Sequence, residues 1–345
     1  MKKKFIAECV LLVALVTLTV WMTATVEQSR LQPPPVTEPA TQPTEAVAPL
    51  VATWTALPED YILTCGKYFV YDLDAERYIM LSGGTGVELY PASITKLFTA
   101  YVAMQHLDGD ALVTVGEEIE MIDPDSTTAG LEEGDQLTVN MLVGGMMLPS
   151  GNDAAYVLAV AAGRQILQQP ELDAAQALAA FVEEMNDQAW KQGMTGSHFA
   201  NPDGIHDDGH YISIEDMCLL GKLAMETPLL EEYARTPAMT VQVGERELTW
   251  RNTNALLHDR ELKFYNEQEK EETDEENEES EEVYRNFYCE YATGLKTGRT
   301  TPAGSCLLSS FDVQDRRLLI GVFDCLDGEY RFSDTLFLLN IALGL

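Results

Sequence analysis

A predicted helix between Pro91 and Met104 places a serine and a lysine on one face. Apolar residues recur in it at the spacing of a helix that packs against a core; they are Ile94, Leu97, Phe98, Tyr101 and Met104. Ser93 and Lys96 are three residues apart, so they lie one helical turn from each other. A serine hydroxyl becomes a useful nucleophile when a neighbouring base takes its proton. We therefore interpret Ser93 and Lys96 as a catalytic pair.

Two further motifs strengthen this interpretation. A Ser-x-x-Lys string alone is expected about once by chance in a chain of this length, so it is weak on its own. The chain also contains Ser150-Gly151-Asn152 and Lys296-Thr297-Gly298. Ser-x-x-Lys, Ser-x-Asn and Lys-Thr-Gly, in this order, form the pattern of penicillin-recognising serine enzymes. The sequence therefore predicts that three distant segments fold together around one cleft.

The first two motifs supply the groups that acyl transfer needs. Ser93 is predicted to attack a carbonyl and form an acyl-enzyme, and Lys96 to accept its proton, because burial lowers the pKa of a lysine. Ser150 can relay the proton toward a leaving amine. Asn152 can donate a hydrogen bond to the substrate amide.

The third motif suits the recognition of a peptide end. Lys296 is a second cation, and together with the Thr297 hydroxyl it matches a substrate carboxylate. Gly298 leaves space for the substrate backbone to pair with the strand that carries the motif. These three residues are therefore predicted to bind substrate.

Longer strings around the motifs carry a family resemblance. They are Leu148-Pro149-Ser150-Gly151-Asn152-Asp153-Ala154-Ala155, His198-Phe199-x-Asn201-Pro202-x-Gly204, and Gly294-Leu295-Lys296-Thr297-Gly298 followed by Ala303-Gly304. From about Ala56 to Gly344 the chain resembles the low-molecular-weight penicillin-binding proteins, which are serine-type D-alanyl-D-alanine carboxypeptidases.

The resemblance implies a fold and additional site residues. The fold is α+β and β-lactamase-like, with an antiparallel sheet flanked by helices and a mostly helical subdomain. The backbone N–H groups of Ser93 and Arg299 would form an oxyanion hole. Thr300 and Arg331 match family positions that help to hold the terminal carboxylate. Many relatives carry an extra C-terminal β domain that is not expected here.

The implied reaction is removal of the terminal D-Ala from peptidoglycan stem peptides, through an acyl-enzyme on Ser93. β-Lactam antibiotics would act as covalent inhibitors, and no cofactor or metal is expected. Hydrolysis and transpeptidation use the same acyl-enzyme, so the sequence leaves their balance open.

The charge of the chain argues against nucleic acid or an anionic membrane as an electrostatic partner. The formal net charge is −34, whereas nucleic acids and anionic membranes are bound by clustered Lys and Arg. Residues 267–282 contain 11 acidic groups and one Lys, which accounts for −10 of that charge. Because such a run repels itself, we predict a disordered acidic insertion at about 265–284, with a Ca²⁺ or cationic-partner site as the alternative.

The N-terminus predicts export from the cytoplasm. Lys2-Lys3-Lys4 precede a mainly apolar run from Phe5 to Val26, which is long enough to cross a bilayer. Residues 1–31 are therefore interpreted as a retained signal anchor or a cleaved signal peptide. A Pro-rich tether (32–54) and a catalytic domain (55–345) follow. The domain is expected at the outer face of the cytoplasmic membrane, or secreted if the signal is cleaved.

Hydrophobic patterning predicts strands at both ends of this domain and helices between them. The expected strands are 67–72, 77–81, 290–295, 305–311 and 317–323, the last two joined by a turn at Gln314-Asp315. The expected helices are 138–147, 154–162, 174–192, one starting near Ser213, and a final one capped by Ser333. Of the cysteines, Cys289 and Cys306 are the first candidates for a disulfide.

Three other functions have specific sequence arguments. A β-lactamase must hydrolyse its acyl-enzyme quickly, which in one major class takes a Glu that positions a water. The nearest match, Gln169-Pro170-Glu171-Leu172-Asp173, has Gln169 in that place and is interpreted as a helix-connecting loop. His206 and His210 lie near Asp203, Asp207 and Asp208, as in some metal sites, but Gly204 and Gly209 favour a polar loop. A non-catalytic wall-binding module is the third alternative, and the intact motifs argue against it.

Overall fold

The computed structural model describes residues 61–258, 261–264 and 283–344. The predicted signal or anchor, the tether and nearly all of the acidic insertion lie outside these ranges. In the described residues, no helix combines the length and the apolar character needed to cross a membrane.

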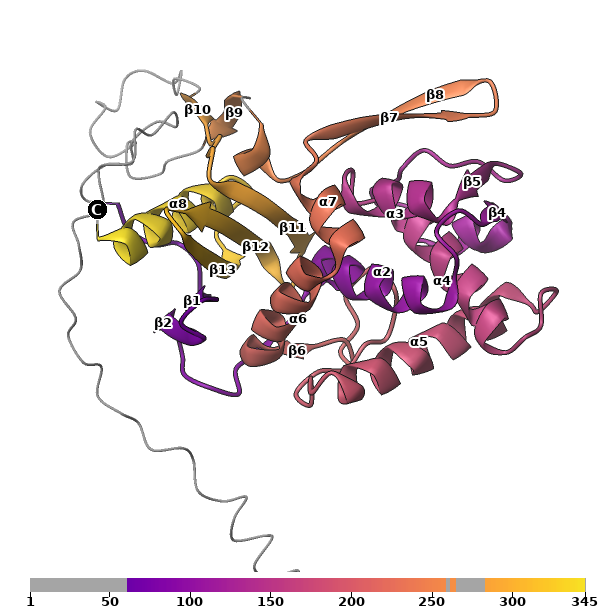
Figure 1. The fold of residues 1–345 in the computed structure, drawn as a ribbon, viewed down its shortest axis with the longest axis horizontal. Coiled ribbons are helices and arrows are strands. Elements are labelled where there is room, and N and C mark those ends of the chain that lie inside the picture. Colours follow the sequence, from indigo (N-terminus) through magenta and orange to yellow (C-terminus); the bar gives the residue numbers. More distant parts are fainter. Residues whose placement is uncertain (1–60, 259–260, 265–282, 345) are drawn as a thin grey trace, which may run out of the picture. The chain divides into compact units, whose positions relative to one another are not determined.

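A five-stranded antiparallel sheet joins the two ends of the described chain (Figure 1). Its strands, in spatial order, are β11 (Ala292–Thr300), β12 (Gly304–Val313), β13 (Arg316–Cys325), β1 (Lys67–Asp72) and β2 (Arg77–Leu81). Lys67 lies opposite Phe323 in the β1–β13 register. The sheet is thus assembled from both ends of the domain, as predicted.

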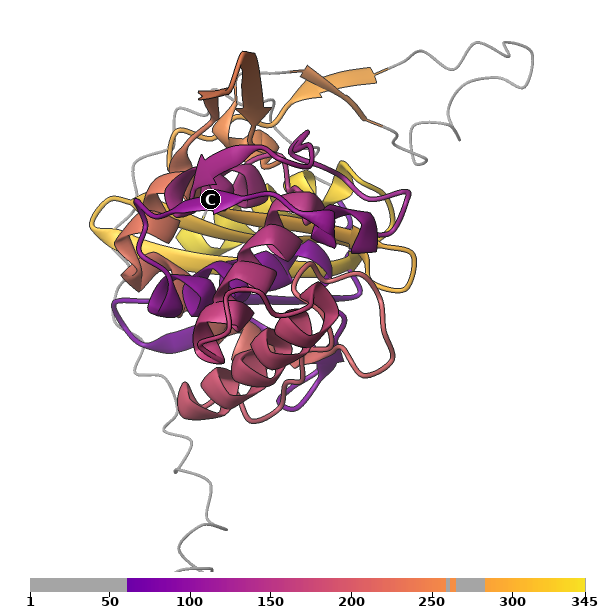
Figure 2. The ribbon, with the colours of Figure 1, turned by 90° about the vertical axis from the view of Figure 1, so that its right-hand side faces the viewer.

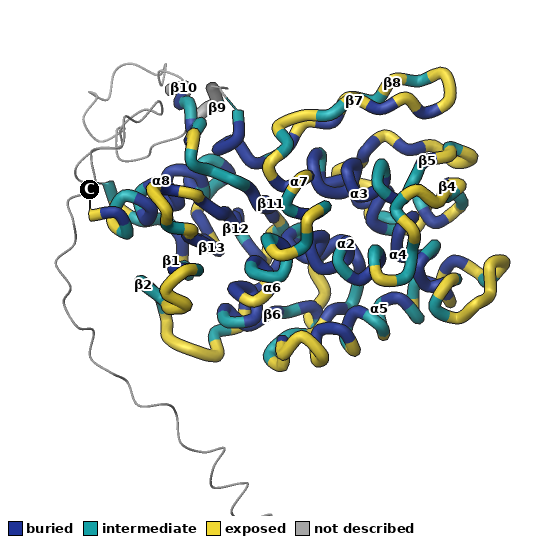
Figure 3. The backbone as a smooth tube through the Cα atoms, viewed as in Figure 1, coloured by how far each residue is buried: buried dark blue, intermediate teal, exposed yellow. Residues whose placement is uncertain are grey.

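The central strands are buried on both faces (Figure 3). Phe69 and Leu319 belong to one core cluster, while their chain neighbours Val70 and Ile320 belong to the other. Helix α8 (Tyr330–Leu343) contacts β12 and β13 on the side of the second cluster, and α6 (Ile214–Glu226) contacts the same strands from the first. Because successive side chains of a strand point to opposite faces, this arrangement requires runs of consecutive apolar residues.

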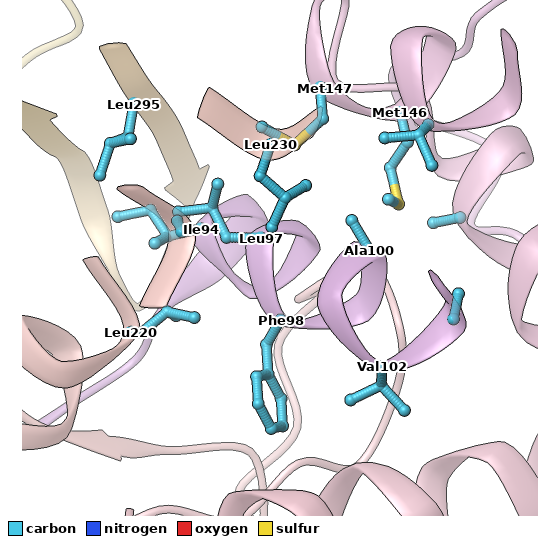
Figure 4. Close-up of a cluster of buried hydrophobic side chains, with 14 of the residues drawn as sticks. Ile94, Leu97, Phe98, Ala100, Val102, Met146, Met147, Leu220, Leu230 and Leu295 are labelled. Carbon is cyan, nitrogen blue, oxygen red and sulfur yellow. The ribbon is translucent and has the colours of Figure 1, made fainter. Parts of the chain in front are cut away.

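Helix α2 (Thr95–His106) is the centre of the helical region, which lies in front of the sheet in Figure 2. It contacts α6 and four other helices, namely α3 (Val139–Met147), α4 (Asn152–Ile166), α5 (Ala174–Lys191) and α7 (Pro228–Arg235). Leu97 and Phe98 of α2 are fully buried, and Figure 4 shows its apolar side chains among those of neighbouring elements. A helix that is surrounded in this way holds its first turn rigidly.

The other elements are short. They are the strand pairs β3 (Glu88–Leu89) with β6 (Ile212–Ser213), β4 (Leu112–Thr114) with β5 (Gln136–Thr138), β7 (Ala238–Val243) with β8 (Arg246–Arg251), and β9 (Glu261–Phe264) with β10 (Val283–Asn286), and the 3₁₀ helices η1 (Ala92–Ile94), η2 (Glu117–Met121) and η3 (Ala255–Leu257).

Several predicted boundaries are confirmed. β1 and β2 coincide with the expected strands. Thr138 caps α3, because its hydroxyl accepts a hydrogen bond from the Met141 N–H at 3.2 Å. Gln314 and Asp315 both have positive φ, 48° and 65°, as a two-residue type I′ hairpin turn requires.

Two predictions near the C-terminal end are wrong. The last helix begins at Tyr330, and Ser333 lies inside its first turn, where the hydroxyl donates to the Tyr330 carbonyl at 3.1 Å. The Cys289–Cys306 disulfide is absent: both residues are free thiols, and they pack in different core clusters.

Candidate active site

Ser93 and Lys96 are adjacent at the junction of η1 and α2. Lys96 Nζ lies 2.9 Å from Ser93 Oγ and donates to the Asp203 carbonyl oxygen at 2.8 Å. The Lys96 side chain is completely buried, and this burial lowers its pKa to about 8, although Asp203 and Asp153 oppose the shift. About a tenth of this amine is therefore neutral at pH 7, and the neutral form can accept a proton from Ser93.

The loop after α5 holds the turn that carries Ser93. Ala92 has φ +47°, and the Gly204 backbone approaches it so closely that a Cβ on Gly204 would lie 1.9 Å from the Ala92 carbonyl oxygen. Thr99 Oγ1 donates to the Pro202 carbonyl at 2.6 Å. The glycine of the Asn-Pro-x-Gly string is therefore needed for close approach to the nucleophile.

His210 supports the same turn from the end of this loop. The Ala200 N–H donates to His210 Nδ1 at 3.2 Å, so the ring proton is on Nε2, which lies 2.9 Å from Thr95 Oγ1 and donates to it. Burial lowers the pKa of His210 to about 4. The sequence predicts a polar loop around His210, and no motif in it indicates this supporting role.

We expect His210 to make stability fall in mild acid. Its pKa is about 4 in the fold against 6.5 for an ordinary histidine, so the unfolded chain binds the extra proton first as the pH falls from 6.5 to 4. This costs about 3 kcal/mol of unfolding free energy by pH 4, and nothing above pH 7. Chemical denaturation across this range should show the loss in wild type but not in His210→Gln. His206→Gln, which keeps His210, is the control and should show the same loss as wild type; equal pH dependence in all three proteins would contradict the assignment.

The Ser-x-Asn motif lies where α3 ends and α4 begins. Ser150 is buried with φ +67°, and Asn152 opens α4, where its Nδ2 donates to Ser126 Oγ at 2.8 Å. The Asp153 carboxylate accepts the N–H groups of Ala129 and Leu131 at 2.7 and 3.0 Å, which fixes the turn against the preceding loop. A constrained backbone at Ser150 is a common feature of functional turns.

The Lys-Thr-Gly strand passes directly beside the nucleophile. A Cβ on Gly298 would lie 3.2 Å from the Ser93 amide nitrogen and 3.0 Å from the Pro91 carbonyl oxygen, so only glycine fits well. Lys296 is buried, and its pKa is well below the ordinary value because of burial and the nearby charges of Lys96 and Arg331. The three charged groups therefore belong to one site.

Hydrogen bonds made by Thr253 connect the second and third motifs. The Thr253 N–H donates to the Leu148 carbonyl at 3.0 Å, and Thr253 Oγ1 lies 2.6 Å from Thr297 Oγ1. Leu148 lies two residues before Ser150, so this contact sets the distance between the Ser-x-Asn turn and β11. The role of Thr253 could not be recognised from the motifs alone.

The predicted carboxylate-binding residues occupy different surroundings. Arg331 is partly buried in the first turn of α8, and its Nη1 donates to the Gly298 carbonyl at 3.2 Å. Its Nε is buried with no hydrogen-bond partner among the described residues. Arg299 is mostly exposed and lies 4.0 Å from Asp327, whereas the Thr300 hydroxyl accepts the Ala303 N–H at 3.2 Å in the β11–β12 turn. Arg331 is therefore the best-placed of the three to meet an anion.

The two histidines that resemble a metal site make separate contacts. His210 bonds to Thr95, as described above, whereas His206 pairs with Asp208 at 3.5 Å and packs edge-on against Tyr90. Across the ranges that the structure describes, no three His, Cys, Asp or Glu side chains are arranged to hold a metal ion.

Solved structures show which class of fold this is. The crystal structure of the Streptomyces K15 DD-transpeptidase matches with a TM-score of 0.67 at 24% identity, covering 83% of this chain and 99% of that one. Penicillin-binding protein D2 from Listeria monocytogenes, solved in a cefotaxime-bound form, matches with a TM-score of 0.61 at 23% identity. It covers 82% of this chain and 99% of that chain. The fold is thus the β-lactamase-like fold of the DD-peptidases.

Sequence comparison then identifies the family. The profile for D-alanyl-D-alanine carboxypeptidase, peptidase S11, matches residues 56–268, and this chain belongs to that family. The match includes the first two motifs and ends before Lys296.

Curated relatives carry the same family name. DacF of Bacillus subtilis is 24% identical over 285 residues, which are 79% of this chain and 62% of the relative. The D-alanyl-D-alanine carboxypeptidase of Streptomyces sp. K15 is 32% identical over 198 residues, 51% of this chain and 65% of the relative. The chain therefore spans a little under two thirds of the length of these relatives.

Proposed function

We propose that this chain is a serine D-alanyl-D-alanine carboxypeptidase that removes the terminal D-Ala from peptidoglycan stem peptides. The observation that carries the proposal is the 2.9 Å contact between Ser93 Oγ and the buried amine of Lys96, with Gly298 of β11 against the Ser93 amide nitrogen. This arrangement supplies a nucleophile, a base and a substrate-binding strand at one point.

In the proposed reaction, neutral Lys96 takes the proton of Ser93 while Oγ attacks the carbonyl between the two D-Ala residues. The backbone N–H groups of Ser93 and Arg299 stabilise the oxyanion. Ser150 passes the proton to the leaving amine, the C–N bond breaks, and D-Ala departs. Water then attacks the ester on Ser93, and the shortened peptide is released as a carboxylic acid.

Substrate binding uses the other end of the site. Asn152 donates to the substrate amide, and Gly298 allows the peptide to lie along β11. Lys296, Thr297 and Arg331 attract the terminal carboxylate. Arg299 and Thr300 complete this end of the site, and Thr300 acts there partly through the turn that it caps.

The proposed substrate defines where the protein works. Peptidoglycan lies outside the cytoplasmic membrane, which suits attachment through residues 1–31 or secretion. The net charge of −34 argues against nucleic acid as a partner. β-Lactams resemble the substrate as acylating agents, so they should label Ser93 covalently, and the reaction needs neither cofactor nor metal.

D-Ala release tests the function directly. The full chain is incubated with a peptide that ends in D-Ala-D-Ala, or with a control peptide that ends in L-Ala-L-Ala, and free alanine of either configuration is measured. We expect release of alanine from the first peptide alone. Protein that binds penicillin but releases no D-Ala would overturn the proposal.

Fast hydrolysis of fluorescent penicillin would indicate a β-lactamase, whereas a long-lived label supports the carboxypeptidase.

Acylation should become faster as the pH rises toward 8. Lys96 must be neutral to accept the proton, and its pKa is about 8, so the rate constant should rise about tenfold per pH unit below that value and level off above it. The rate of labelling by fluorescent penicillin between pH 5.5 and 9.5 checks this, with thermal unfolding measured at each pH. A flat profile through pH 8 would contradict the role of Lys96. Because Lys296 lies nearby, the midpoint of this pH profile reports the coupled titration of the Lys96 and Lys296 amines.

A further inference from the structure

Two cysteines lie opposite each other where β1 and β13 meet. Cys325 is the last residue of β13, and Cys65 lies two residues before β1. Lys67 pairs with Phe323, and the Gly66 N–H donates to the Asp324 carbonyl at 3.1 Å, so the two segments remain side by side beyond β1. Cys65 and Cys325 are the next residues outward from this hydrogen bond. Both side chains are buried free thiols.

The two thiols lie on the same side of the sheet. Regular alternation from Phe69 and Phe323 would place them in the first core cluster, but both Cys65 and Cys325 belong to the second. Asp324, with φ +56°, interrupts the regular strand just before Cys325. Both cysteines therefore flank the Gly66–Asp324 hydrogen bond on one face, as the two halves of a disulfide must. A Cys65 hydrogen bond and burial hold the pKa of the Cys325 thiol well above its usual value, which agrees with this placement.

The segment that carries Cys65 is fixed by a buried carboxylate. Asp334 of α8 accepts the Cys65 N–H at 2.8 Å, the Thr64 N–H at 3.1 Å and the Tyr61 hydroxyl at 2.6 Å. Cys65 is therefore held against the end of β13 by groups that do not depend on its sulfur.

We propose that Cys65 and Cys325 form a disulfide that joins the first and last strands of the domain. The oxidant is a small-molecule or protein disulfide. The Cys65 thiolate attacks it and displaces one thiol, and Cys325 then displaces the second, so two protein thiols become one disulfide as the donor is reduced to two thiols. The bond closes a loop of about 260 residues in the unfolded chain, for which the chain-entropy model predicts a large effect.

The neighbouring thiol Cys306 provides a matched control. It is fully buried, and its sulfur donates to the Ala303 carbonyl at 3.3 Å. Cys306→Ala should therefore keep the Cys65–Cys325 bond, while Cys65→Ala and Cys325→Ala should each lose it. The inference concerns residues outside the proposed catalytic groups, so it stands or falls independently of the proposed function.

The test uses the full chain, which has six cysteines. It is equilibrated with reduced or oxidised glutathione, alkylated under denaturing conditions and digested for mass spectrometry. We expect a linked peptide pair containing Cys65 and Cys325 after oxidation, and an unfolding temperature on the order of 5 °C above that of the reduced protein. Cys306→Ala should retain both. Alkylation of Cys65 and Cys325 in the oxidised protein, or linkage of either to another cysteine, would overturn the proposal.

Discussion

Replacing Ser93 by alanine should abolish D-Ala release and covalent labelling by penicillin. Alanine removes only the hydroxyl, so neither the Lys96 contact with the Asp203 carbonyl nor the packing of α2 should change. Because no acyl-enzyme can form, we expect the rate to fall by at least about 10⁴-fold, as for other enzymes that lose their nucleophile. Fluorescent penicillin on a denaturing gel and a D-Ala assay measure the two activities.

The variant must remain folded for this result to count. An unfolding temperature close to that of the wild type, together with reversible binding of penicillin to the variant, would separate loss of chemistry from loss of structure. If the folded variant kept a tenth or more of the wild-type rate, Ser93 could not be the nucleophile.

Lys96→Met should produce the second-largest loss. Methionine nearly matches the length and apolar character of the lysine stem but cannot accept a proton, so acylation should slow by about 10³- to 10⁴-fold. The variant also leaves the Asp203 carbonyl without its donor, so we expect a modest decrease in stability as well. Lys191→Met, which changes a lysine whose side chain is 56% exposed, serves as the control.

The pH dependence separates the two explanations for a slow Lys96→Met variant. If Lys96 is the base, the residual acylation should lose the rise toward pH 8 that the wild type shows. If the variant kept that rise with a uniformly lower rate, another group would be the base and Lys96 would only shape the site.

The sequence predicted the sheet well because its strands carry unambiguous local signals. The β12–β13 hairpin has long apolar runs on both sides of a polar two-residue turn, and β1 and β2 have polar boundaries. The start of α8 was placed too late because Ser333 resembles a helix cap. Here that hydroxyl bonds back to the Tyr330 carbonyl inside the helix, which local sequence does not distinguish from capping.

The site was predictable to the extent that it consists of contiguous motifs. Ser93 and Lys96 are brought together by one turn of the chain, so their spacing was sufficient to pair them. His210 contacts Thr95, which is 115 residues away in the sequence, and Thr253 contacts Thr297, which is 44 residues away. Such contacts arise only when the helices and the sheet pack together, so no short-range pattern indicates them.

Trapping the acyl-enzyme from a peptide substrate is the most direct test of the account as a whole. The full chain is mixed with a peptide that ends in D-Ala-D-Ala, quenched in acid within milliseconds to seconds, digested and analysed by mass spectrometry. We predict an adduct on the peptide that contains Ser93, with the mass of the substrate acyl group after loss of one D-Ala. An adduct on Ser150 or any other residue, or release of D-Ala by a Ser93→Ala protein, would contradict the account.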